Sequence, residues 1–194
     1  MQNIKLVVGL IILTIMFSGF WSGKSKREIQ KEKFIEIQKR LHINNQTMQL
    51  LYKYAPESQN MVMRSYGYAT FDNIGVNLVL FSAEGGKGVA HNNRTGWNTY
   101  MNMASGGFGI GLGAKDFKAI FLFENKRVFD NFINNGWEAN AQADAAAKLG
   151  EDGGALNTSI TVAPGVRLYK LTQNGLAMQA TIQGSKYWKD DDLN

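Results

Sequence analysis

Apolar and polar positions follow three different patterns along this chain, and the first is an uninterrupted apolar run. Residues 6–21 carry no charge and are almost entirely apolar, which is typical of a signal peptide or a signal anchor. The run is short for a helix that crosses a bilayer, which favours a cleaved signal, whereas residues 17–23 offer no clean pair of small residues for cleavage. Residues 1–23 are therefore expected to act as a cleaved signal or a retained anchor. Basic residues after a retained anchor would favour a cytoplasmic body, but we favour export.

Helical spacing follows this segment. Residues 25–42 begin with Ser25 and have Glu28 three positions later, which is the pattern of a capping box. The apolar stripe expected on this basic helix consists of Phe34, Ile37 and Leu41. Such a helix can lie on anionic lipid headgroups or pack its stripe on the body of the protein, and the sequence favours neither alternative. A second helix is expected from residue 45 or 47 to residue 55, ahead of a proline.

Short apolar runs separated by Gly, Asn and Asp turns begin at residue 61, which predicts strands. The expected strands are residues 61–71, 75–81, 88–91, 97–103, 107–113, 117–123, 156–172 and 176–184, the last two joined by an Asn-Gly pair. Helices are expected at residues 126–134 and in the Ala-rich residues 138–149. The predicted fold class is α+β, a predominantly antiparallel sheet or barrel-like meander with N-terminal amphipathic helices and two helices inserted before the last strands.

The positive charge is concentrated directly after the apolar segment. Residues 24–53 hold eight Lys or Arg and three Glu, whereas residues 54–194 hold twelve Lys or Arg and thirteen acids. A nucleic-acid binder would more often carry a basic face on the body itself, so this distribution favours a membrane surface as the partner. The expected domains are residues 1–23 as leader, 24–44 as basic amphipathic helix and 45–194 as globular domain. The candidate lipid-binding residues are Lys24, Lys26, Arg27, Lys31, Lys33, Lys39 and Arg40.

Residue types that support catalysis or metal binding are scarce. The chain has no Cys, which excludes disulfides, a zinc ribbon and a thiol nucleophile, and His42 and His91 alone make a weak metal site. No pair among Asp72, Glu84 and Asp116 has a spacing that distinguishes acid–base catalysis from solvated turns, and the acidic tail at residues 190–192 is expected to be a solvated end. We therefore expect a protein without catalytic activity, cofactor or metal.

Glycines alternate with apolar residues shortly before the predicted strand at residues 117–123. Residues 109–114 formally match the dinucleotide fingerprint G-x-G-x-x-A, but a strand follows instead of the helix whose N-terminus would meet the phosphate. The alternation instead places the glycines on one face of a strand, where another element can approach closely or a groove can form. These structural or groove-lining glycines are Gly107, Gly109, Gly111 and Gly113.

Aromatic residues cluster near turns and element ends. They are Trp97, Tyr100, Trp137, Tyr169, Tyr187 and Trp188. Such residues either pack over the edge of a sheet, which is the commoner outcome, or anchor the protein in a lipid headgroup layer.

The order of the glycine and aromatic motifs resembles the SYLF domain over about residues 45–189. The motifs are Gly85-Gly86-Lys87-Gly88, Gly96-Trp97, residues 107–114, the strand at 117–123 followed by Asn125-Lys126, Ala163-Pro164-Gly165, Tyr169, Asn174-Gly175-Leu176 and Gly184. The resemblance implies binding to membrane lipids, with acidic or phosphoinositide headgroups preferred and actin association reported among eukaryotic relatives. It also implies that bacterial members are exported or envelope proteins, and that the basic N-terminal helix contacts lipid.

The leading hypothesis is a non-enzymatic lipid-binding protein that contacts anionic phospholipid in the bacterial cell envelope, exported to the periplasm or anchored in the membrane. Two alternatives remain open. The same surfaces could bind an envelope protein as a scaffold or interaction module, or an enzyme could act in the glycine-lined groove. Neither a nucleic acid nor a cofactor is expected as a partner.

Overall fold

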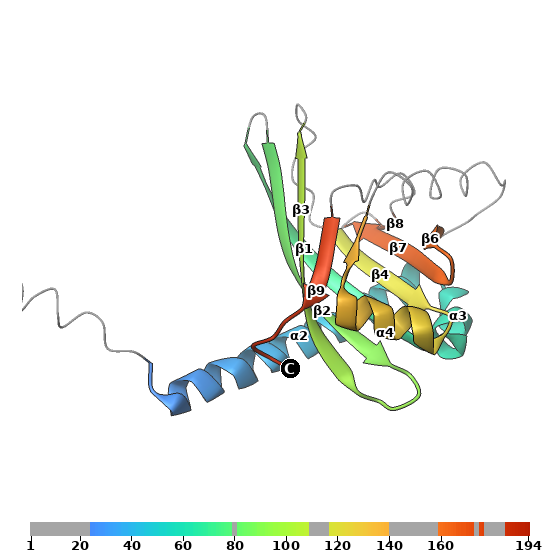
Figure 1. Ribbon diagram of the computed structural model, residues 1–194. Helices are drawn as coiled ribbons and strands as arrows, with labels where there is room; N and C mark the ends of the chain where they lie inside the picture. Colours follow the sequence, from blue (N-terminus) through green and yellow to red (C-terminus); the bar gives the residue numbers. More distant parts are fainter. Residues whose placement is uncertain (1–23, 79–80, 109–116, 140–158, 173–174, 177–184) are drawn as a thin grey trace, which may run out of the picture. The chain divides into compact units, whose positions relative to one another are not determined.

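Helices and a single antiparallel sheet make up the structure, a computed structural model that describes residues 24–78, 81–108, 117–139, 159–172, 175–176 and 185–194. Within these ranges, nine strands form the sheet in the order β5-β9-β3-β2-β1-β4-β7-β6, with β8 pairing with β7 (Figure 1). The predicted α+β class is confirmed. The chain divides into two compact units, residues 1–35 and 36–194, and the boundary falls within the first described helix.

The described helices and strands have the following bounds. The helices are α2 (Lys26–Tyr54), α3 (Ser58–Arg64) and α4 (Lys126–Asn135). The strands are β1 (Gly67–Leu78), β2 (Phe81–Asn92), β3 (Asn98–Phe108), β4 (Phe117–Phe123), β5 (Trp137–Glu138), β6 (Ile160–Ala163), β7 (Val166–Thr172), β8 (Gly175–Leu176) and β9 (Ser185–Lys189).

Helix α2 replaces the two helices expected before residue 56, and its predicted capping box is confirmed. The backbone N–H of Ser25 donates to Glu28 Oε2 at 2.8 Å, and the N–H of Glu28 donates to Ser25 Oγ at 3.3 Å. The predicted apolar stripe is wrong, because Phe34 is 62% exposed. The residues that α2 buries are Arg40, Asn44, Thr47, Met48 and Leu51, so the first half of the buried face is polar.

Strand β4 organises the core because it is buried on both faces, as a sequence of six apolar residues and one Lys allows. Its odd-numbered residues from Phe117 to Phe123 belong to one cluster, together with Phe129 and Phe132 of α4. Its even-numbered residues Ile120 and Leu122 belong to a second cluster on the other face. That cluster also contains Met48, Leu51, Ala55, Val62, Tyr169 and Leu171. Helix α4 therefore covers one face of the sheet, and the C-terminal half of α2 with α3 covers the other.

Two segments adopted a different structure from the one expected. The strand expected at residues 61–71 begins instead with helix α3, and β1 starts only at Gly67. Val62 of α3 is 5% exposed and belongs to the same apolar cluster as Leu51 of α2. Because α3 is too short to show a helical period in its sequence, this packing determines its conformation. The strand expected at 156–172 is interrupted between β6 and β7 by Pro164 and Gly165, whose φ of 76° suits a turn and not a strand.

Other expectations were met or fall outside the described residues. Strand β4 and helix α4 are confirmed, with Asn125 Oδ1 accepting a hydrogen bond from the N–H of Val128 at the start of α4. The predicted breaks within residues 67–92 and 98–108 are wrong, because β1, β2 and β3 are long and pair continuously. Strand β5 ends at Glu138, where a helix was expected to begin, and most of the helix expected at 138–149 lies outside the described residues, as does most of the strand expected at 176–184.

Glycines in β1 and β2 allow side chains of neighbouring strands to fill the space between them. A Cβ atom at Gly88 would lie 2.6 Å from the carbonyl oxygen of Thr70 and would overlap the ring of Phe71. A Cβ atom at Gly85, in the same strand, would meet no atom within 4 Å. The two positions therefore form a matched pair for testing the packing of the sheet.

We expect Gly88→Ala to lower the free energy of unfolding by about 2–3 kcal/mol, because the buried ring of Phe71 must move. Gly85→Ala should change it by less than about 0.5 kcal/mol, because the added methyl group meets open space. Urea denaturation followed by circular dichroism measures both. Equal stability of the two variants would contradict the described register of β1 on β2.

Candidate functional site

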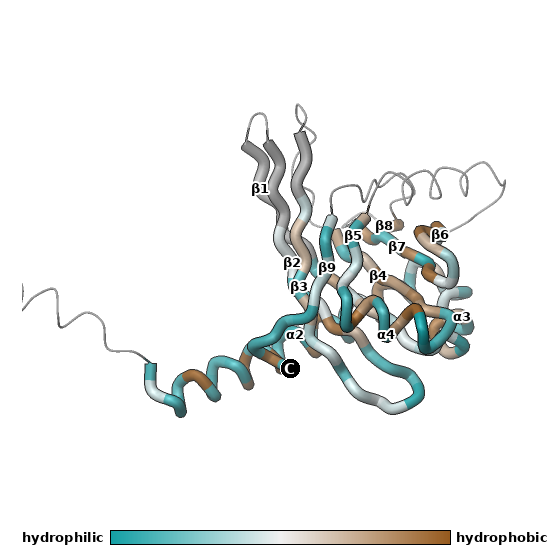
Figure 2. Tube along the Cα trace, viewed as in Figure 1, coloured by the Kyte–Doolittle hydropathy of each residue, from teal (hydrophilic) through white to brown (hydrophobic). Residues whose placement is uncertain are grey.

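Six of the seven candidate lipid-binding residues are exposed, and the seventh is not. Lys24, Lys26, Arg27, Lys31, Lys33 and Lys39 are exposed. Arg40 is only 3% exposed, so its guanidinium cannot reach a headgroup and the expectation for this residue is wrong. Figure 2 shows hydrophobic positions as isolated segments among hydrophilic ones along the start of α2, without a continuous apolar face.

The guanidinium of Arg40 makes four contacts, three of which join α2 to β3 and to the segment after β9. Its Nε donates to Glu36 Oε1 at 2.9 Å, and its Nη1 donates to the carbonyl oxygen of Met101 in β3 at 3.0 Å. Its Nη2 donates to Asp190 Oδ2 at 2.6 Å and to Asn102 Oδ1 at 3.4 Å. Arg40 therefore has a structural role, because its removal would leave Asp190 buried without a counter-charge.

Asp190 corrects the expectation of a solvated acidic tail. Its side chain is 8% exposed, and it lies directly after β9. Burial alone would raise the pKa of this carboxyl, but the hydrogen bond and the charge of Arg40 outweigh burial, so the pKa lies below its ordinary value. Asp191 and Asp192 are exposed, as expected for a solvated end.

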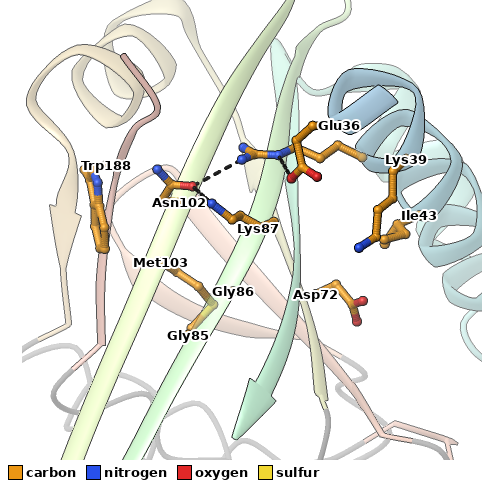
Figure 3. A pocket seen from close by; sticks show the side chains of 11 residues that line it. Glu36, Lys39, Ile43, Asp72, Gly85, Gly86, Lys87, Asn102, Met103 and Trp188 are labelled. Carbon is orange, nitrogen blue, oxygen red and sulfur yellow. Dashed lines mark hydrogen bonds and ion pairs between the residues drawn. The ribbon is translucent and has the colours of Figure 1, made fainter. Parts of the chain in front are cut away.

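A pocket of about 420 Å³ lies beside the Arg40 ion pair (Figure 3). Helix α2 contributes Glu36, Lys39, Arg40 and Ile43, and the sheet contributes the rest of the wall. The sheet residues are Asp72, Gly85, Gly86, Lys87, Asn102, Met103 and Trp188. The pocket is therefore built by residues from five separate segments, and only Lys39 and Arg40 were among the predicted lipid-binding residues.

The carboxylates of this pocket are paired, whereas two of its ammonium groups are not paired with a carboxylate. Glu36 accepts from Arg40, and Asp72 Oδ1 accepts from Lys118 Nζ at 2.5 Å. Lys87 Nζ donates to the amide oxygen of Asn102 at 3.1 Å, and neither Lys87 nor Lys39 forms an ion pair within the described part of the chain. Apolar walls come from Ile43, Met103 and Trp188. The pocket therefore suits an anionic group that carries an apolar part.

The remaining candidates for chemistry are not brought together. His91 Nδ1 is 2.8 Å from Asn98 Oδ1 and its ring lies against Tyr68, while His42 is exposed on α2. Among the described residues, no group of three or more His, Asp or Glu side chains converges on a possible metal position. No described helix has both the length and the apolar character needed to cross a membrane.

The predicted glycine groove falls mostly outside the described residues. Gly107 lies in β3 and pairs with Ser82 of β2, whereas Gly109, Gly111 and Gly113 lie outside the described ranges. The predicted aromatic residues differ in exposure. Tyr169 and Tyr187 are fully buried and Tyr100 and Trp137 are half-buried, whereas Trp188 is 38% exposed and Trp97 is 77% exposed.

Comparison with known proteins found one informative similarity. The chain is 37% identical over 143 residues to Beta cell expansion factor A of Aeromonas veronii, and the match covers 74% of this chain and 53% of that protein. This chain therefore spans about half the length of the curated relative. No family model matches the sequence.

Replacement of Arg40 should destabilise the fold much more than replacement of its exposed neighbour. We expect Arg40→Met to lower the free energy of unfolding by about 3–5 kcal/mol, because Asp190 would lose its buried counter-charge. Lys39→Met should change it by less than about 0.5 kcal/mol. Urea denaturation measures both variants. A double variant that also carries Asp190→Leu should recover part of the loss, and no recovery would show that the charge pair is not the cause.

The pair should also make stability depend on pH in a defined window. Because the folded pKa of Asp190 is lowered, its contribution is fully present above the unfolded pKa of about 3.9 and is lost as the pH falls through the folded pKa. We therefore expect the stability difference between the protein and Asp190→Asn to be constant from about pH 5 to pH 7 and to shrink below about pH 4. Urea denaturation across this pH range measures the difference. A difference that stays the same down to pH 2 would contradict the pairing.

Proposed function

We propose that this chain binds membranes containing anionic phospholipids, without catalytic activity, through the exposed basic residues at the start of α2. The observation that carries the proposal is the excess of exposed positive charge between residues 24 and 39. Six Lys or Arg side chains in this stretch are exposed, whereas it holds only three Glu residues, each of which has a partner. Glu28 completes the capping box, Glu32 accepts from Lys24 at 2.6 Å, and Glu36 pairs with the buried Arg40.

This arrangement favours adsorption at the charged surface over insertion into the lipid tails. Three apolar residues of this stretch are exposed, namely Ile29, Phe34 and Ile35. None of them is three or four positions from another, so they do not share one face of the helix. A basic residue near an anionic leaflet contributes about 1 kcal/mol, and the attraction is screened over roughly 8–10 Å at physiological salt. Binding through these residues should therefore be strongly salt-dependent.

The pocket beside Arg40 supplies a second place for an anionic group on the body. Lys39 and Lys87 both line it without a carboxylate partner among the described residues, and Ile43, Met103 and Trp188 give it apolar walls. A phospholipid headgroup with the start of its glycerol backbone has this combination of charge and apolar surface. The pocket therefore supports lipid as the ligand over a purely polar anion.

The finer assignment, a SYLF-type domain in an exported or envelope-anchored bacterial protein, is part of the same proposal. It is supported by the order of the glycine and aromatic motifs and by the apolar residues 6–21 at the start of the chain. The similarity to Beta cell expansion factor A is compatible with it but covers only half of that protein.

The proposal predicts that three charge-neutralising changes abolish most of the binding to anionic vesicles. The full chain and the variant Lys31→Gln, Lys33→Gln, Lys39→Gln are sedimented with vesicles of phosphatidylcholine alone or with phosphatidylglycerol added. We expect the chain to bind the anionic vesicles in low salt, and the triple variant to bind at least about tenfold more weakly, because three contacts of about 1 kcal/mol each are lost.

A variant with the same change in net charge serves as the control. It carries Lys53→Gln, Arg127→Gln and Lys186→Gln, which lie on exposed positions of α2, α4 and β9 outside the basic stretch. This control should bind like the unchanged protein. Equal loss in both variants would indicate a nonspecific charge effect, and equal binding to neutral and anionic vesicles in high salt would contradict electrostatic adsorption. Absence of any vesicle binding would favour an acidic protein partner in the envelope.

A further inference from the structure

The loop between β2 and β3 exposes a tryptophan that the proposed charge-based function does not use. Trp97 is 77% exposed, the largest value among the exposed large hydrophobic residues of the described chain. It follows Gly96, whose φ of 75° closes the loop. Met63 of α3, the helix against which this loop packs, is 62% exposed. A single exposed apolar residue is common on protein surfaces and is not by itself evidence of a function. The structure of the loop provides the further evidence for Trp97.

The backbone of this loop is hydrogen-bonded within the protein, although the loop lies at the surface. Every N–H from Asn92 to Trp97 has an acceptor. The N–H groups of Arg94 and Thr95 donate to Asn92 Oδ1 at 2.8 and 3.2 Å, and that of Gly96 donates to the Asn92 carbonyl at 2.8 Å. The N–H of Asn92 donates to the Trp97 carbonyl at 2.9 Å, that of Asn93 to the Tyr66 carbonyl at 3.0 Å, and that of Trp97 to Thr95 Oγ1 at 3.3 Å.

The loop is also fixed to the end of α3. Asn93 Nδ2 donates to the carbonyl oxygens of Val62 and Ser65 at 2.8 and 3.2 Å and to Ser65 Oγ at 3.1 Å. Arg94 Nη2 lies 3.4 Å from the carbonyl oxygen of Arg64. Trp97 is therefore presented by a loop whose conformation is set by the body, so ordering it on a binding surface costs little conformational entropy.

From this geometry we infer that the β2–β3 loop inserts the Trp97 ring into the headgroup layer of a bilayer. Unpaired N–H groups are costly where the headgroup layer borders the hydrocarbon core, and this loop has none between residues 92 and 97. An indole ring favours this layer because it combines a large apolar body with one N–H donor. The inference rests on the proposed membrane function but uses residues distinct from the basic stretch.

The contribution of the Trp97 ring is apolar and not electrostatic. The hollow next to the ring is lined by residues with uncharged side chains, which include Tyr100, Leu193 and Asn194. Removal of an apolar ring from water does not depend on the charge of the surface that it enters. Binding through Trp97 should therefore persist at salt concentrations that screen the basic stretch.

Quenching by brominated lipid tests the inference in the full chain, which contains four tryptophans. Tryptophan fluorescence is measured with phosphatidylcholine–phosphatidylglycerol vesicles whose acyl chains carry bromine. We expect quenching in the unchanged protein, loss of most of it in Trp97→Phe, and retention of it in the control Trp137→Phe, whose ring lies in β5 outside both the pocket and the β2–β3 loop. Because Trp97 is exposed, urea denaturation should give Trp97→Phe the same stability as the unchanged protein.

Sedimentation with the same lipids, unbrominated, gives a second readout. Trp97→Ala should weaken binding by about tenfold in low and in high salt, since a large apolar side chain is lost from the membrane contact. Quenching that is equal with and without Trp97, or unchanged binding by Trp97→Ala, overturns the inference. If only the Lys31, Lys33, Lys39 variant loses binding, the proposed function stands without the Trp97 anchor. If only Trp97→Ala loses binding, the anchor stands and the electrostatic proposal fails, and a chain that binds no vesicle overturns both.

Discussion

The guanidinium of Arg40 connects helix α2, strand β3 and the segment after β9 at a single buried point. Its partners include the Met101 carbonyl and the carboxylate of Asp190, both within 3.0 Å. Because polar contacts have fixed directions, they hold α2 in one register on the sheet, whereas an apolar interface would tolerate small shifts. That register places Arg40 inside and its neighbour Lys39 in the wall of the pocket. The burial of Arg40 and the exposure of Lys39 both follow from this contact.

The parts of the fold that the sequence predicted are those specified by local pattern. Strand β4 was predicted at its observed bounds, since six apolar residues and one Lys leave little alternative between the polar Lys115-Asp116 pair and a helix cap. Helix α4 was found from its spacing and from the glycine after it, which has a φ of 71°. The capping box of α2 is likewise local, because both partners lie within four residues.

The parts that could not be predicted depend on contacts between distant residues. Arg40 and Asp190 are 150 positions apart, and nothing in a run of three aspartates marks the first as buried and the others as exposed. The same limit applies to α3, whose seven residues become helical on packing against the cluster around Leu51. The long strands β1 and β2 were expected to break at glycines, yet Gly88 is required inside the sheet because the ring of Phe71 occupies the space of its Cβ.

The three membrane contacts proposed for this chain differ in what the fold must provide. Adsorption of flexible lysines onto an anionic surface needs only net charge, because Coulomb attraction has no strict geometry. Recognition of one headgroup in the pocket needs Lys39 and Lys87 at a fixed separation, and an inserted ring needs a loop that does not unfold at the surface. The Asn44–Thr70 hydrogen bond of 2.8 Å and the Arg40 ion pair fix the position of α2, and therefore of Lys39, on the sheet. The side chains of Asn92 and Asn93 fix the conformation of the loop that carries Trp97. Arg40 and Asn44 are buried polar groups, which often contribute less stability than apolar side chains would, but their directional contacts fix the register of α2 on the sheet and with it the position of Lys39.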